Sequence, residues 1–185
     1  LYTDLGLFTA DPEIGADIAE MFNYLTGYSH PRGYRKVLVA PFNLREGILR
    51  EIDRTIESHS PELPARIRMK MNSLLDPAAI RALYKASQAG VQVEINVRGI
   101  CALRPGVPGL SDSIEVRSIL GRFLEHSRIY WFENGGEHVA WIGSADMMHR
   151  NLDRRVEVLV KLPGDENVRE VEFLLDLAFE PTTAG

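Results

Sequence analysis

The stretch between residues 124 and 146 constrains the fold of this chain more than any other. Two segments rich in β-branched and aromatic residues flank the tripeptide Asn134-Gly135-Gly136. Apolar runs of this kind on either side of an Asn-Gly turn are typical of a β-hairpin. The stretch therefore predicts two antiparallel strands joined by a tight turn.

Polar residues at the ends of this hairpin predict an anion site. His126 and Arg128 stand two positions apart at the head of the first strand, and alternate residues of a strand project to the same face. The second strand ends in Gly143-Ser144, whose backbone N–H groups can bind an anion where the chain turns towards a helix. Imidazole, guanidinium and amide groups at one edge favour phosphate. The ordinary alternative for His126 is a half-buried, hydrogen-bonded histidine without a catalytic role.

Strand and helix patterns alternate along the rest of the chain. Periodicity and turn residues predict strands at residues 36–40, 67–71, 91–97, 114–116 and 156–161. Helices are expected after the N-cap residues Asp11, Asn43 and Asp76, a short helical turn at residues 119–124, and a closing amphipathic helix at residues 165–179. This alternation indicates an α/β domain whose mixed or mostly parallel sheet is flanked by helices on both faces.

Composition narrows the classes of function. The chain has 185 residues, 45% hydrophobic and 25% charged, as expected for a globular domain with its own core. A formal net charge of −5 argues against bulk nucleic-acid binding. The single cysteine, Cys101, fits a reducing cytosol, and no apolar run approaches the roughly 18 residues of a membrane span. We expect a cytoplasmic chain with no nucleic-acid partner, no membrane span and no metal site of its own.

The hairpin residues also carry a resemblance to a known superfamily. His126-Ser127-Arg128, Glu133 and then Gly143-Ser144 resemble the second half-motif of the phospholipase D superfamily. Arg128, Glu133 and Asp146 stand where that motif has Lys, Asp and Asn, and the gap before the Gly-Ser pair is longer. These departures fit another branch of the superfamily.

Longer blocks resemble bacterial polyphosphate kinase, almost from end to end. They lie at residues 70–74, 97–106, 123–128 and 150–155, and residues 1–9 resemble a point midway through that enzyme. The resemblance implies a phospholipase-D-like C-terminal domain at residues 31–185. It also implies a leading helical segment, residues 1–30, which continues from an upstream domain and packs elsewhere in the parent protein.

The resemblance implies an activity as well. The parent enzyme would reversibly transfer the terminal phosphoryl group of ATP to inorganic polyphosphate through a phosphohistidine. That histidine and the ligands of Mg²⁺ are expected outside this chain, so the chain alone should be inactive. Its partners would be ATP or ADP, polyphosphate, the upstream domains and further copies of the enzyme, in the cytoplasm or at the periphery of the inner membrane.

Site residues follow from the residues and the resemblance together. His126 is the catalytic candidate, by proton transfer or charge stabilisation. Arg98 ends a buried strand, where ligands collect in open α/β sheets, and the resemblance makes it a contact to nucleotide phosphates. Lys70 is either a phosphate ligand or a solvated strand-edge lysine. The complete phosphate- or nucleotide-binding set is Tyr2 (on the resemblance alone), Lys70, Arg98, His126, Arg128, Ser144 and Arg155, the last chosen from the cluster Arg150, Arg154 and Arg155.

Two alternatives stay open. A phosphodiesterase working as a dimer would pair His126 of each copy across a two-fold axis, and would then need no further histidine. A non-catalytic module would bind nucleotide or polyanion without turning it over.

Overall fold

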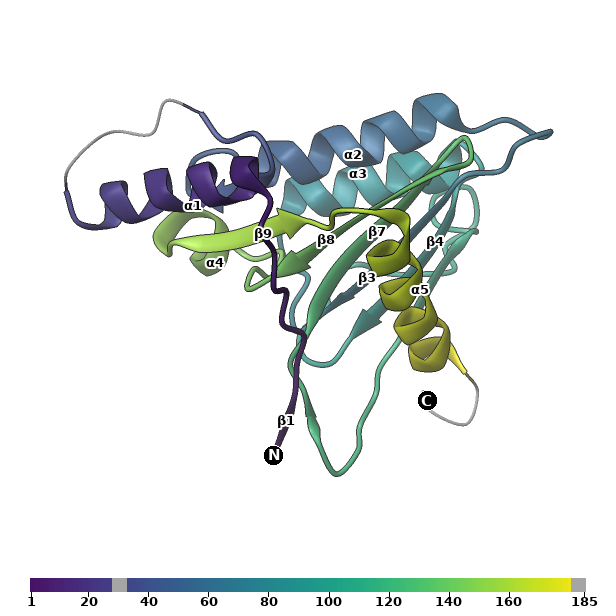
Figure 1. Ribbon diagram of the computed structural model, residues 1–185. Helices are drawn as coiled ribbons and strands as arrows, with labels where there is room; N and C mark the ends of the chain where they lie inside the picture. The colour runs from purple at the N-terminus through teal and green to yellow at the C-terminus, as the bar shows by residue number, and fades with distance from the viewer. Residues whose placement is uncertain (28–32, 181–185) are drawn as a thin grey trace.

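A seven-stranded sheet forms the centre of the computed structural model, which describes residues 1–27 and 33–180 (Figure 1). The strands follow the order β2-β9-β8-β7-β3-β4-β5. Their bounds are β2 (Val37–Ala40), β3 (Arg66–Met71), β4 (Gln92–Val97), β5 (Ile114–Arg117), β7 (Arg128–Asn134), β8 (Glu137–Gly143) and β9 (Glu157–Lys161). β3, β4 and β5 are parallel to one another, whereas all other neighbours pair antiparallel. The sheet is therefore mixed.

Helices cover both faces of this sheet, which confirms the predicted fold class. α2 (Leu44–Ser58) and α3 (Pro77–Gln88) lie side by side on one face, and α5 (Asp165–Phe179) lies on the other (Figure 1). The larger apolar core fills the space beneath α2 and α3. A smaller core between the sheet and α5 contains Trp131 and Leu175, and the N-terminal residues Leu5 and Leu7 pack against it.

The predicted hairpin is confirmed. β7 and β8 are paired along their whole length, and the turn residues Gly135 and Gly136 have φ angles of 60° and 89°, a region that favours glycine. None of the helices in the described residues is long and apolar enough to cross a membrane.

The segment before the hairpin differs from expectation. Residues 124–125 form a short strand, β6 (Leu124–Glu125), parallel to β1 (Tyr2–Thr3), and no helical turn precedes it. The expected turn at residues 119–124 is wrong because the partner of this segment lies far away in sequence. β7 begins at Arg128, so His126 precedes the strand rather than heading it.

Helix starts follow the predicted N-caps with one exception. The Asp11 carboxylate accepts from the Glu13 and Ile14 N–H groups at the start of α1 (Pro12–Leu25), and the Asp76 carboxylate accepts from Ala79 N–H in α3. Asn43 precedes α2, but its side chain accepts from Val39 N–H of β2 at 2.7 Å instead of capping the helix. The short helix α4 (His149–Arg154) follows β8.

The leading helix contacts the start of the central sheet at β2. Asp17 of α1 is buried, and one of its carboxylate oxygens accepts from the backbone N–H groups of Arg35, Lys36 and Val37, at the start of β2. Phe22 and the last residue of α1 remain exposed. The expected boundary between residues 30 and 31 lies outside the described residues.

Candidate functional site

The sheet topology gathers most of the predicted site residues at one edge. β7 runs antiparallel to β3, so its first residues lie beside the carboxyl end of β3. Arg98 follows the last residue of β4, which is parallel to β3, and therefore lies at that same edge. The end of β8 joins them, because Gly143 is the register partner of Arg128.

His126 projects from the connection between β6 and β7 and meets the N-terminal segment. Its Nδ1 lies 2.7 Å from a carboxylate oxygen of Asp4, and its backbone N–H donates to the Thr3 carbonyl at 2.9 Å. The Tyr2 ring contacts the imidazole edge to face, with centroids 5.5 Å apart. Burial by itself would raise the pKa of Asp4, but the hydrogen bond to His126 lowers it below the ordinary value. The ionised Asp4 accepts from Nδ1–H, which leaves Nε2 available for acid–base chemistry.

Arg128 lies against the imidazole of His126. Its Nη1 is 3.0 Å from Nε2 and 3.2 Å from Nδ1 of His126. An atom almost equally distant from both ring nitrogens lies over the ring rather than along one lone pair, so this contact is a stacking of the guanidinium on the imidazole. Arg128 thus places a positive charge beside His126.

Asp146 holds Arg128 and connects it to the neighbouring strands. Its carboxylate oxygens lie 3.2 Å from Nε and 3.3 Å from Nη2 of Arg128, and one of them accepts from Asn72 N–H at 2.8 Å. The Asn72 side-chain oxygen in turn accepts from Arg98 Nε at 3.0 Å. Two of the three arginines predicted to bind phosphate, Arg98 and Arg128, are therefore linked through Asp146 and Asn72.

A cavity of about 350 Å³ opens beside His126 and Arg128. The N-terminal segment contributes one wall, and the ends of β8 and β9 contribute the other. Its remaining lining residues are Asp4, Leu5, Leu7, Ile142, Gly143, Ser144, Val158 and Val160. His126, Arg128 and Ser144 thus share one cavity, whereas Lys70, Arg98 and Arg155 do not line it.

Gly143 and Ser144 are used for sheet packing, which corrects the expectation that their amides face an anion. The Ser144 N–H donates to the Val158 carbonyl at 3.0 Å, and the Ser144 hydroxyl accepts from Val158 N–H at 3.1 Å. A Cβ at Gly143 would lie 2.0 Å from the same Val158 carbonyl oxygen. Glycine is therefore required at position 143 by the close approach of β9.

Lys70 is a buried lysine of a central strand, not a solvated edge residue. It is 6% exposed, and its ammonium group contacts Glu125 and Ser127. It lines a different cavity, of about 280 Å³, on the α5 face of the sheet. The structure thus does not bring Lys70 into the cavity of His126.

The arginine cluster after the Gly-Ser turn lies in and beside α4. Arg155 is exposed, and its Nη1 is 3.8 Å from the buried carboxylate of Glu157. Arg154 contacts His149 at 3.4 Å. Neither arginine reaches the cavity of His126.

Two carboxylates of the site were not assigned from the sequence. Asp4 is 122 residues from His126, and no local pattern connects the two residues. Asp146 could have been predicted as a site residue, because it stands at the Asn position of the phospholipase D motif. Both carboxylates have partners in this structure, Asp4 in His126 and Asp146 in Arg128 and Asn72. Within the described residues, no group of three or more His, Cys, Asp or Glu side chains is arranged to hold a metal ion.

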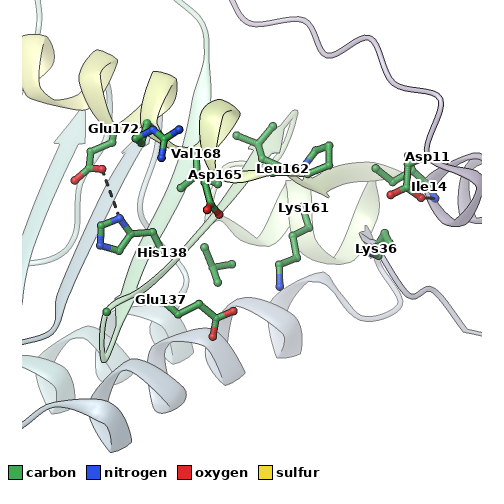
Figure 2. Close-up of a pocket in the computed structure, with 15 residues that line it drawn as sticks. Asp11, Ile14, Lys36, Glu137, His138, Lys161, Leu162, Asp165, Val168 and Glu172 are labelled. Carbon is green, nitrogen blue, oxygen red and sulfur yellow. Dashed lines mark hydrogen bonds and ion pairs between the residues drawn. The ribbon is translucent and has the colours of Figure 1, made fainter.

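A larger cavity, of about 750 Å³, lies between α1, the start of β8 and α5 (Figure 2). Its walls carry both signs of charge, with Lys161 directed into the space and Asp165 across from it (Figure 2). His138 lies at one end, 3.6 Å from Glu172. None of the predicted site residues lines this cavity, so size alone gives no reason to place the chemistry there.

The fold and the His–Arg edge define a phospholipase-D-like α/β domain. NucT from Helicobacter pylori matches 76% of this chain and 91% of its own length, with a TM-score of 0.56 and 13% sequence identity. Nuc from Salmonella typhimurium, a phospholipase D family member, matches the same shares with a TM-score of 0.54 and 20% identity. At these identities the likeness concerns the fold, and it confirms the predicted fold class.

The sequence places the chain more narrowly. The family profile described as polyphosphate kinase C-terminal domain 2 matches residues 37–184, and the chain belongs to the polyphosphate kinase family. The crystal structure of polyphosphate kinase from Porphyromonas gingivalis covers 95% of this chain with a TM-score of 0.90 and 37% identity. The predicted family is thereby confirmed.

Curated relatives agree with this assignment. The polyphosphate kinase of Streptomyces coelicolor is 55% identical over 185 residues, and that of Mycolicibacterium paratuberculosis is 57% identical over 183 residues. The chain spans about a quarter (25%) of the length of each. The 36 residues before the family profile are included in the first of these matches, which covers the whole chain.

Proposed function

We propose that this chain forms the nucleotide-facing part of a polyphosphate kinase, which transfers the terminal phosphoryl group of ATP reversibly to inorganic polyphosphate. The observation that carries the proposal is the His126 imidazole, bonded to Asp4 at Nδ1, stacked on Arg128 and open to a cavity. The transferred group would pass through a phosphohistidine supplied by residues outside this chain.

His126 acts on the oxygen that gains or loses charge during transfer. Because Asp4 occupies Nδ1, Nε2 is the atom that donates a proton to, or accepts one from, that oxygen. The Asp4 carboxylate also orients the imidazole, as an acid beside a catalytic histidine does in other enzymes. Arg128 adds a positive charge where the phosphate oxygens gather.

Arg98 and Tyr2 bind the nucleotide in this proposal. Arg98 uses Nε for Asn72 and makes no other side-chain bond to the described residues, so its two terminal nitrogens can bind two phosphate oxygens at once. Tyr2 is largely exposed beside His126, which suits a contact with a ligand in the cavity. Ser144 borders the cavity, and the exposed Arg155 binds phosphate groups of the polyphosphate chain outside the cavity.

The remaining partners follow from the family. Magnesium ions supply charge neutralisation for the phosphates when bound, and their ligands belong to residues outside this chain. The proposed partners are the nucleotide, polyphosphate, upstream domains of the same polypeptide and further copies of the enzyme. The proposed location is the cytoplasm or the cytoplasmic surface of the inner membrane.

The test is His126→Gln in the full-length polyphosphate kinase that carries these residues. Glutamine keeps a polar group but cannot be protonated, so we expect turnover to fall roughly 10²- to 10⁴-fold while KM changes little. The control is His149→Gln, which changes a histidine that is 70% exposed and outside the cavity, and which should leave both constants unchanged. A raised KM with normal turnover would make His126 a binding residue only.

A further inference from the structure

Lys70 occupies an unusual place for a lysine. It lies in β3, near the centre of the sheet, and its strand neighbours Met69 and Met71 face the core beneath α2 and α3. Lys70 therefore faces the opposite side of the sheet, with only 6% of its surface exposed. Burying an ammonium group is costly unless its hydrogens are bonded, so its partners indicate its role.

Among the described residues, the partners of this ammonium group lie on either side of His126. Nζ donates to the Ser127 hydroxyl at 2.8 Å and to the Ser127 carbonyl at 3.3 Å, and it lies 3.2 Å from a carboxylate oxygen of Glu125. An ammonium group has three hydrogens, and these three acceptors match them. Lys70 thus contacts the residue before His126 and the residue after it.

The segment held in this way lies outside the central sheet, and Arg128 also donates to the His126 carbonyl at 2.8 Å. His126 and Ser127 lie between β6 and β7 and belong to neither strand. The backbone bond of His126 to the Thr3 carbonyl attaches the segment to β1 on one side, and Lys70 attaches it to the sheet on the other. Removing the ammonium would take away the contacts to residues 125 and 127 on either side of His126, and would leave the bonds that His126 itself makes to Thr3, Asp4 and Arg128.

The surroundings of Lys70 do not favour direct phosphate binding. The cavity of about 280 Å³ that it lines is bordered mainly by apolar side chains, among them Ile129, Leu174 and Leu177. Asp4 and Leu5 line both this cavity and that of His126, so the N-terminal segment lies between the two. Burial lowers the pKa of Lys70, and the Glu125 carboxylate opposes this by stabilising the charged form.

We propose that Lys70 is a positioning residue, which fixes residues 125–127 so that the imidazole of His126 meets Asp4 and faces its cavity. This inference rests on the proposed function only for the importance of His126. The geometric part concerns the ligand-free protein and can be tested without a substrate.

The test compares Lys70→Met with the control Lys85→Met, which removes an exposed lysine that pairs with Asp53. The readouts are the ¹⁵N chemical shifts of the His126 imidazole in the ligand-free chain and the affinity for inorganic tripolyphosphate at two salt concentrations. We expect the His126 shifts to move in Lys70→Met and to stay unchanged in Lys85→Met. Any loss of tripolyphosphate affinity should keep the wild-type salt dependence, because no phosphate contact is removed.

Unchanged His126 shifts in a folded Lys70→Met protein would overturn the proposal. If the affinity then fell roughly 10- to 150-fold with a weaker salt dependence, Lys70 would be a direct phosphate ligand. If Lys70→Met does not fold, the same measurement is made on Ser127→Ala, which removes one acceptor of the ammonium group. Unchanged His126 shifts in that variant would equally overturn the proposal. A chain that binds no tripolyphosphate but shows the expected shifts would contradict the proposed function and leave the positioning role supported.

Discussion

Gly143 is a residue whose side chain is excluded by the neighbouring strand. A Cβ at this position would lie 2.0 Å from the Val158 carbonyl oxygen, and backbone atoms cannot move aside as a side chain can. We expect Gly143→Ala to lower the free energy of unfolding by about 3 kcal/mol, the upper part of the usual range for overpacking. Urea denaturation measures this loss.

Gly15→Ala provides the matched control for that measurement. Gly15 lies inside α1, and a Cβ there would meet nothing within 4 Å. Because alanine is the better helix former, we expect this variant to gain about 0.5–1 kcal/mol. Equal stability of the two variants would contradict the packing role given to Gly143.

At the residue scale, the sequence predicted which side chains lie near one another better than it predicted their hydrogen-bond partners. His126 and Arg128 lie together as expected, although His126 is not in a strand. The anion site expected at Gly143-Ser144 was wrong because the amide of Ser144 is used by Val158, a residue of a strand that the local pattern does not involve. Hydrogen-bond partners across a sheet depend on strand order, which one stretch of sequence does not contain.

Arg45 of α2 connects this helix to α3 and α4, and its ion pairs should make the free energy of unfolding depend on pH below about pH 4. Its guanidinium bonds both carboxylate oxygens of Asp153 in α4 and also contacts Asp76, the N-cap of α3. The bond to Arg45, with a smaller contribution from the bond to His149, lowers the pKa of Asp153 from 3.8 to about 2. Since this carboxyl has the lower pKa in the folded state, the stabilisation is present above about pH 4 and is lost as the pH falls towards 2.

We expect Arg45→Met to remove this acid dependence. The partly exposed Asp153 pair should contribute about 1 kcal/mol, less than the pKa shift alone would give, because water screens it. At neutral pH the variant should lose about 1–3 kcal/mol in total, since the buried Asp76 carboxylate also loses a partner. Thermal unfolding between pH 2 and 7 provides the measurement, with Lys85→Met as the control. A wild-type pH profile in the variant would show that Asp153 does not titrate as described.

Elements with strong local signals were predicted well, and those that depend on distant partners were not. The strands and long helices follow hydrophobic periodicity and the caps Asp11 and Asp76, as the structure confirms. The strand β6 was missed because it consists of two residues paired with β1, more than a hundred positions away. Likewise, the capping role expected of Asn43 failed because Val39 competes for its side chain.

For the whole molecule, we expect the isolated chain to show no turnover. A two-histidine mechanism needs a second histidine near His126, and among the described residues no other histidine lines its cavity. A coupled ATP assay with polyphosphate and a hydrolysis assay with bis-p-nitrophenyl phosphate should both give no activity. Hydrolysis that disappears in His126→Ala would instead favour the dimeric phosphodiesterase.

The contact between Asp4 and His126 also has a consequence for where this domain can be cut. The family profile begins at residue 37, yet the carboxylate that bonds His126 comes from residue 4. A chimaera assembled at the profile boundary would inherit the histidine from one parent and its acid from the other. The unit for recombination or transplantation therefore has to include β1 and Asp4, because the boundary of the family profile separates Asp4 from His126.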